Sequence, residues 1–307
     1  MQWLELTVQT HPDAVESVSE LFSGYSRDGV VIEEPFELSD DGQDYRIKVG
    51  EPVQIHAYLP IDGKEEAATR EIAEGLWHFS SIGAHFVGEL HTRIVDEEDW
   101  ANAWKDYYFV THIGQRLVIR PSWREYTPKE HEVVVTLDPG MAFGTGVHPT
   151  THMCVEQVEQ KVRPGMKVLD VGTGSGILAL AAAKLGAAAV YAIDNSSVAV
   201  TSTIENARLN ALEDTIHTVL GVLDEVEAER MEGQYDLVFA NIIAHVIGSI
   251  APELARVVAP DGLLIVSGII EARRPDAEGP LLAAGLELVE EMKINDWLCL
   301  VLRRKRA

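Results

Sequence analysis

The chain has 307 residues, and 46% of them are apolar, so it can bury one large or two modest hydrophobic cores. Its 49 acidic residues exceed its 25 basic ones and give a net charge of −24. This charge disfavours direct binding to nucleic-acid phosphates and favours a basic protein partner, although solubility alone would also account for it.

Cysteine usage and the first residues of the chain bear on its compartment. Cys154 and Cys299 lie far apart and form neither a C-x-x-C motif nor a disulfide framework, which favours a reducing compartment. The first eight residues alternate like a strand and lack the layout of a signal peptide, and no apolar run is long enough to span a bilayer. We therefore expect a cytoplasmic protein without a membrane partner; the oligomeric state is not predicted.

Residues 1–95 are predicted to form a small α+β domain. Strand-like alternation and amphipathic spacing follow each other in the order βαββαβ, which is typical of a ferredoxin-like fold. The polar segment 37–50 is predicted to be an exposed loop. The expected strands are 3–10, 29–34, 53–59 and 86–95, and the expected helices begin at 12 and span 64–79.

Residues 96–130 are predicted to link two domains. Trp100, Trp104 and Tyr108 are spaced four residues apart, which indicates a helix with an aromatic stripe. Packing between two domains is the favoured role of this stripe, and stacking on a ligand is the alternative. Two strands are expected next, at 115–120 and 132–137.

The second domain, residues 131–307, is predicted to be a doubly wound α/β fold. From Lys167 onward, strands alternate with helices, and the last two strands form an antiparallel pair. The expected strands are 167–169, 190–194, 218–220, 235–241, 262–268, 286–294 and 297–302, and the expected helices are 177–185, 196–209, 245–258 and one that ends at 280–284.

A glycine-rich turn follows the first strand of this domain. Residues 170–176 read Asp-Val-Gly-Thr-Gly-Ser-Gly, and Ile177 stands where a dinucleotide fingerprint has its third glycine. An acidic residue before a tighter glycine spacing is typical of S-adenosylmethionine enzymes. Gly172 is a candidate cofactor contact because a side chain there would occupy the space that a ligand needs. An ordinary tight turn is the alternative.

Two polar residues end neighbouring strands of the predicted sheet. Asp194 is placed to accept hydrogen bonds from both ribose hydroxyls of an adenosine cofactor, as in NAD enzymes, or else to cap the helix at Ser196. Asn241 follows four apolar residues and would face the cofactor and the substrate, or cap the next helix.

A second glycine-rich segment, 137–152, lacks the Gly-Lys-Ser/Thr ending of a phosphate-binding loop. Pro149 suits a first helical turn, where Thr150 and Thr151 offer hydroxyls. His148 and His152 lie near Cys154, but no further ligand is suitably spaced, so no metal site is predicted.

Together these motifs resemble the ribosomal protein L11 methyltransferase (PrmA) family over nearly the whole chain. Thr173 and Ile243 are mild departures, because some members have Cys and many have Leu at these positions. The matching residues are 137–146, 148–151 (His-Pro-Thr-Thr), the glycine turn with 177–179, 240–242, 119–123 and the helix with Trp100 and Trp104.

The resemblance implies a seven-stranded Rossmann-like methyltransferase domain after a substrate-recognition domain. It implies S-adenosyl-L-methionine as the cofactor, bound by Thr151, Gly172, Asp194 and Asn241. It also implies methylation of lysine and N-terminal amines of a large-subunit ribosomal protein. A methyltransferase acting on another protein or a small molecule, or a NAD-dependent oxidoreductase, is the alternative.

The residues themselves suggest how such a transfer works. The attacking amine must be neutral, and neutralising a lysine of pKa about 10.4 at pH 7 costs about 4–5 kcal/mol. Asn241 can orient an amine without stabilising its charged form as a carboxylate would, so it is the candidate catalytic residue. No residue of the sequence is singled out as a general base, and the positioning of the two reactants is expected to supply most of the acceleration. The acidic surplus is expected to lie away from the reacting nitrogen.

Overall fold

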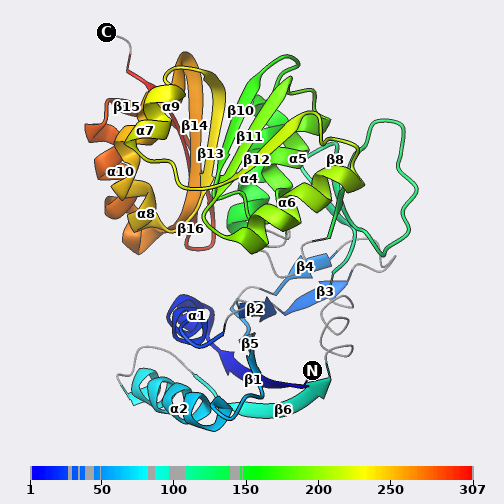
Figure 1. The fold of residues 1–307 in the computed structure, drawn as a ribbon, viewed down its shortest axis with the longest axis vertical. Helices are drawn as coiled ribbons and strands as arrows, with labels where there is room; N and C mark the ends of the chain where they lie inside the picture. Colours follow the sequence, from blue (N-terminus) through cyan, green and yellow to red (C-terminus); the bar gives the residue numbers. More distant parts are fainter. Residues whose placement is uncertain are drawn as a thin grey trace. The chain divides into compact units, whose positions relative to one another are not determined.

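The structure, a computed structural model, describes residues 2–26, 30–33, 35–38, 45–48, 50–81, 87–96, 108–138, 146 and 148–305. It divides into two compact units, Met1–Phe109 and Val110–Ala307. Figure 1 shows the elements of each unit. The predicted linker at 96–130 stays a prediction, because most of its aromatic helix, including Trp100 and Trp104, lies outside the described residues.

The first unit contains a four-stranded antiparallel sheet in the order β2-β5-β1-β6. Its helices α1 and α2 pack through Val18, Phe22 and Ile72 on Leu6 and Ile55 of the sheet. For this sheet and its two α-helices, the predicted βαββαβ order is confirmed. The elements are β1 (Gln2–Thr10), α1 (Val15–Ser23), β2 (Val30–Glu33), β5 (Val53–Pro60), α2 (Glu65–Ser81) and β6 (His91–Asp96).

The prediction of a loop at 37–50 is wrong at residues 37–38 and 45–47, while residues 39–44 and 49 lie outside the described residues. Strands β3 (Phe36–Leu38) and β4 (Tyr45–Ile47) pair in antiparallel register. Apolar and charged residues do alternate in both strands, but each is three residues long and surrounded by polar sequence. The period of two is therefore too short to stand out.

The second unit is built on a seven-stranded sheet in the order β12-β11-β10-β13-β14-β16-β15. The first five strands of this order are parallel, and β16 runs antiparallel to both β14 and β15. This confirms the doubly wound sheet with a C-terminal hairpin. The strands are β10 (Lys167–Val171), β11 (Ala189–Asp194), β12 (Ile216–Leu220), β13 (Tyr235–Asn241), β14 (Val258–Ile270), β15 (Leu286–Ile294) and β16 (Trp297–Arg304).

The chain order of the parallel strands reverses between β10 and β13. From β10 the chain proceeds outward to β11 and β12, and it then returns to β13 on the other side of β10. In open α/β sheets the ligand binds beyond the carboxyl ends of the strands at such a switch point. The fold therefore predicts a ligand site at the carboxyl ends of β10, β11 and β13.

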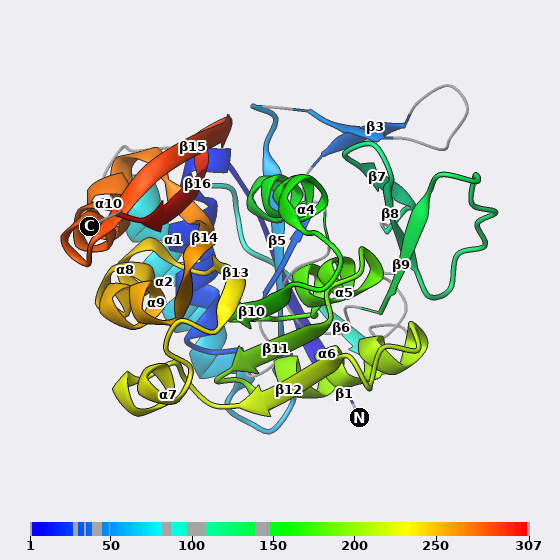
Figure 2. The ribbon, with the colours of Figure 1, turned by 90° about the horizontal axis from the view of Figure 1, so that it is seen from above.

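Helices cover both faces of the sheet, as Figure 2 shows. The core cluster around Leu180 and Phe239 includes α4 and α5, and the cluster around Val238 and Leu254 includes the helices of the opposite face. The helices are α4 (Pro149–Lys161), α5 (Ile177–Lys184) and α6 (Ser197–Leu209) on one side, and α7 (Glu225–Arg230), α8 (Ala244–Ser249), α9 (Ala251–Val257) and α10 (Arg274–Ala283) on the other.

The prediction of one continuous helix at 245–258 is wrong. The segment forms two helices, α8 and α9, which are separated at Ile250. Pro252 lies in the first turn of α9, and a proline there has no N–H to continue the preceding helix.

A three-stranded sheet lies beside the main one, in the order β7 (Thr111–Ile113), β8 (Leu117–Pro121) and β9 (Val133–Leu137). The sequence predicted β8 and β9 but missed β7, which has three residues. Strands β7 and β8 are antiparallel, and β8 and β9 are parallel.

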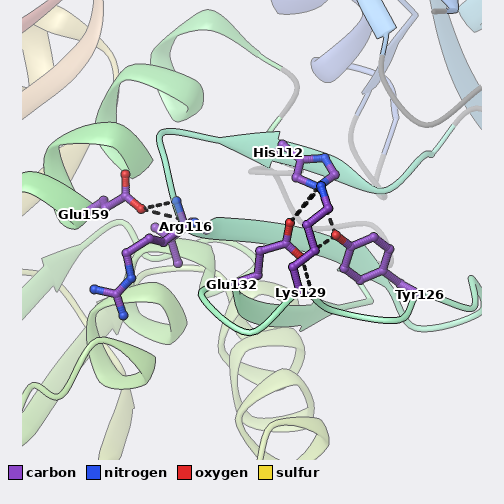
Figure 3. A network of polar contacts seen from close by, with 7 residues as sticks. His112, Arg116, Tyr126, Lys129, Glu132 and Glu159 are labelled. Carbon is purple, nitrogen blue, oxygen red and sulfur yellow. Dashed lines mark hydrogen bonds and ion pairs between the residues drawn. The ribbon is translucent and has the colours of Figure 1, made fainter. Parts of the chain in front are cut away.

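Figure 3 shows two polar clusters that hold this smaller sheet. In one, Glu159 of α4 accepts from the backbone N–H groups of Gln115 (2.7 Å) and Arg116 (2.6 Å) in the β7–β8 turn. In the other, the Tyr126 hydroxyl donates to Glu132 Oε2 at 2.6 Å. Burial and this hydrogen bond raise the pKa of Tyr126 to about 12, so the hydroxyl remains a donor at neutral pH.

Candidate functional site

The glycine turn lies between the end of β10 and the start of α5. Gly172, Gly174 and Gly176 have φ of 73°, 57° and 83°, in the left-handed region that glycine adopts without strain. A Cβ on Gly172 would lie 2.3 Å from Ile242 Cγ2, so packing within the protein already requires a glycine there. The turn is therefore specified by the fold as well as by any ligand.

Asp194 lies at the end of β11, beside this turn. Its Oδ2 accepts from the N–H of Gly174 at 3.0 Å, and its Oδ1 accepts from the N–H of Ser196 at 2.9 Å. Ser196 itself is the N-cap of α6, so capping is not the role of Asp194. A carboxylate has about four acceptor positions, which leaves capacity for two hydroxyl donors.

Asn241 and Thr151 come together from distant parts of the chain. Asn241 ends β13, and its Nδ2 donates to the Thr151 hydroxyl in the first turn of α4 at 3.3 Å. Within the described part of the chain, the buried Oδ1 of Asn241 has no hydrogen-bond partner. The cap of α8 is Ile243, so the alternative role for Asn241 as a helix cap does not hold. A buried amide oxygen without a donor fits a ligand N–H.

Asp170 is a site residue to which the sequence gave no role of its own. The Thr173 hydroxyl donates to its Oδ2 at 2.7 Å, and a backbone hydrogen bond from Ala179 in the first turn of α5 also favours the ionised carboxylate. Burial raises the pKa of Asp170 to about 7, and the charge of Asp194 acts in the same direction. The sequence signal that could have identified Asp170 was its position as an acidic residue directly before a glycine turn.

Apolar side chains are exposed shortly after the ends of three of the parallel strands, β11, β12 and β13. Val198 follows β11, Val222 follows β12 and Ile243 follows β13; their exposed fractions are 41%, 57% and 54%. Large apolar side chains left in solvent at a strand edge are typical of a ligand site. Sequence reasoning missed them because exposure cannot be read from an apolar residue alone.

The residues weighed as metal ligands have other roles. His148 caps α4 by accepting from the N–H of Thr150 at 3.3 Å, and burial lowers its pKa to about 4, which leaves the ring neutral. The Nε2 of His152 lies 3.4 Å from Glu156 Oε1. No group of three potential ligands occurs within the described ranges, and the absence of a metal stays a prediction. Likewise, none of the described helices is long and apolar enough to cross a membrane.

Comparison with known proteins agrees with a cofactor site at this edge of the sheet. A sequence profile described as "Ribosomal protein L11 methyltransferase (PrmA)" matches residues 2–305. The chain belongs to this family.

Relatives and one solved structure agree with the PrmA assignment. The ribosomal protein L11 methyltransferase of Chloroflexus aurantiacus is 42% identical, with 98% of each chain covered. That of Pelotomaculum thermopropionicum is 43% identical, with 99% of this chain and 100% of the relative covered. A crystal structure of a ribosomal protein L11 methylase from Lactobacillus delbrueckii subsp. bulgaricus covers 65% of this chain and 100% of its own, at 36% identity and a TM-score of 0.59.

As a PrmA family member, the chain is a protein methyltransferase that uses S-adenosyl-L-methionine. The site residues fit this cofactor. The Asn241 oxygen, which has no partner among the described residues, offers an acceptor for an amino group; Asp194 retains capacity for hydroxyl donors, and the exposed apolar residues suit an aromatic base.

Proposed function

We propose that this chain methylates lysine side-chain and N-terminal amines of ribosomal protein L11. Support comes from relatives of that name, which match 98% or more of the chain. The observation that carries the proposal is the Thr151–Asn241 pair, whose buried Oδ1 lacks a partner within the described residues. This acceptor lies at the switch point of the sheet, beside the glycine turn.

The proposed cofactor contacts follow from the geometry of this edge. Asp194 accepts from the ribose hydroxyls while its backbone bonds hold it against Gly174. Gly172 has no side chain and is proposed to let the ligand approach the backbone, and Thr151 fixes the amide of Asn241. S-adenosylmethionine, when bound, supplies an electrophilic methyl group on a sulfonium. The contribution proposed for these side chains is to orient the cofactor and the attacking amine relative to each other.

Asn241 is proposed to orient the attacking amine. Because its Nδ2 is engaged by Thr151, its Oδ1 is the atom that accepts an N–H of the substrate and directs the nitrogen lone pair. An amide acceptor leaves the amine pKa lower than a carboxylate would, so more of the amine is neutral. Among the described residues, the Asn241 side chain bonds to no carboxylate, which is consistent with an acidic surplus placed elsewhere.

The proposal extends to partners and domains. The net charge of −24 suits a basic ribosomal protein and disfavours direct contact with RNA. Residues 1–95 are proposed to recognise the substrate, 96–130 to connect, and 131–307 to carry the reaction. The cytoplasm, where ribosomal proteins are made, is the proposed compartment.

Incubation with methyl-labelled S-adenosylmethionine and a ribosome-free extract tests the proposal. We expect label in one small basic protein, identified as L11 by mass spectrometry. Label in another protein or in a small molecule would instead support the alternative substrates. Thermal stabilisation by NADH and not by S-adenosylmethionine would contradict methyl transfer altogether.

A further inference from the structure

Two asparagines bond to the free edge of β9: Asn206 of α6 and Asn210, the C-cap residue of the same helix. Strand β9 is at the edge of its sheet, so alternate backbone groups of the strand have no strand partner. Asn210 accepts from the N–H of Thr136 at 2.9 Å and donates to its carbonyl at 2.6 Å. Asn206 does the same to Asp138, at 2.7 and 2.9 Å. Both side chains are buried.

The spacing of the two asparagines explains why this pairing works. Four residues of helix advance about 6 Å, and two residues of strand advance about 6.6 Å. Asn206 and Asn210 therefore match Thr136 and Asp138 one to one. A side-chain amide presents one acceptor and a donor side by side, as a neighbouring strand would.

Asn206 also reaches the glycine turn, and Asn210 does not. The Nδ2 of Asn206 donates to the carbonyl of Ser175 at 2.9 Å. One helical turn earlier, the Thr203 hydroxyl donates to the carbonyl of Gly174 at 3.0 Å. Consecutive carbonyls of the turn are thus held by one face of α6. A Cβ on Gly176 would lie 2.9 Å from Thr203 Cγ2, so the contact is close.

We propose that Asn206, with Thr203, is a positioning residue of the cofactor site. A carbonyl and the following N–H belong to one planar peptide, so fixing the carbonyls of Gly174 and Ser175 also fixes the N–H groups of Ser175 and Gly176. The N–H of Gly176 donates to the Thr173 carbonyl at 2.9 Å and closes the turn. The amide of Asn206 couples this turn to the end of β9. The inference rests on the proposed function, since it assigns the supported turn to S-adenosylmethionine.

Asn206→Asp and Asn210→Asp form a matched pair of variants of the full-length protein. Each substitution keeps the shape of the side chain, adds a negative charge and removes an N–H donor that serves two backbone carbonyls. For Asn206 these are the carbonyls of Asp138 and Ser175. For Asn210 they are the carbonyls of Thr136 and Asn206. Thr203→Val is a milder variant that removes only the bond to Gly174, and Thr203→Ser restores it.

Two measurements separate positioning from general stability. Amide hydrogen exchange of the ligand-free protein reports on residues 174–177, and calorimetry gives the Kd for S-adenosylmethionine. We expect Asn206→Asp to raise both the exchange rate of the turn and the Kd by about tenfold or more, because buried carbonyls lose their donor. Asn210→Asp should stay within about twofold of the wild type in both. Thr203→Val should show the same pattern more weakly, with rescue by Thr203→Ser.

Equal effects of the two aspartate variants on the turn, or none, would overturn the inference. If Asn206→Asp does not fold, wild-type behaviour of Thr203→Val would overturn it as well. Failure of the wild type to bind S-adenosylmethionine would contradict the proposed function instead. Exchange in the ligand-free protein would still decide whether Asn206 supports the turn.

Discussion

At the scale of single residues, Asn241 shows what a strand end can and cannot reveal. Its position after an apolar strand predicted that it faces the ligand side of the sheet. Its bond to Thr151, 90 residues earlier in the chain, fixes which amide atom remains for a ligand, and only the structure gives that.

Replacing Asn241 tests this role. Asn241→Ala should lower kcat for methylation by about tenfold or more, because the amine loses its orienting acceptor. Gln234→Ala is the matched control, an exposed amide next to the other end of β13, and it should leave kcat unchanged. Steady-state rates at saturating cofactor give the comparison. Unchanged kcat in Asn241→Ala would remove Asn241 from catalysis.

Asp170 predicts a pH dependence of stability. Burial raises its pKa from 3.8 to about 7 in the folded state. Below about pH 4 the carboxyl is protonated in both states, and between about pH 4 and 7 only the folded state keeps the proton. The Asp170 contribution to the free energy of unfolding therefore falls as pH rises through this window, and it is constant above it.

Asp170→Asn removes this contribution, since an amide does not titrate. The free energy of unfolding of the variant relative to the wild type should rise by about 1.4 kcal/mol per pH unit across the window. Urea titrations at several pH values give the difference. Gln234→Ala, which changes an exposed side chain that does not titrate, is the control and should show a flat difference. A flat difference for Asp170→Asn would contradict the raised pKa.

At the scale of elements, the sequence predicted the strands and helices whose hydrophobic pattern is long enough to recognise, and the turns that carry a distinctive motif. The parallel strands and the glycine turn were found from apolar runs and glycine spacing. Strand β7 and the β3–β4 pair were missed because three residues do not establish a period. Asn206 and Asn210 could not be assigned, because an asparagine in a helix does not show which strand it faces.

Glu159 illustrates how one helix holds a neighbouring hairpin. Its carboxylate accepts from the N–H groups of Gln115, Arg116 and Leu117, at 2.7, 2.6 and 3.2 Å. A Cβ on Gly114 would lie 2.1 Å from Glu159 Oε2, so the approach depends on a glycine. The Glu159 carboxylate thus supplies the hydrogen-bond acceptors that a neighbouring strand would otherwise give to the N–H groups of the turn.

Glu159→Gln should lower the free energy of unfolding by about 1–3 kcal/mol, because one acceptor becomes a donor that faces backbone N–H groups. Glu156→Gln, on the same helix, breaks only the partly exposed pair with His152 and should cost about 0–1 kcal/mol. Chemical denaturation of both variants checks this. Equal stabilities of the two would show that Glu159 does not hold the turn.

At the scale of the whole molecule, charge is the property that composition already shows. A net charge of −24 should attract a basic substrate over a range that salt screens. The KM for L11 should therefore rise several-fold between about 50 mM and about 300 mM NaCl, with kcat little changed. The Kd for S-adenosylmethionine is the internal control and should change little. A KM independent of salt would contradict electrostatic recognition.

Mass spectrometry of purified L11 after incubation with the enzyme and S-adenosylmethionine tests the central claim most directly. We expect whole-methyl mass increments that map to lysine side chains or the N-terminal amine and grow with time. They should be strongly slowed with Asn241→Ala and unaffected by Gln234→Ala. Unmodified L11 after incubation with wild-type enzyme that binds the cofactor would contradict the account.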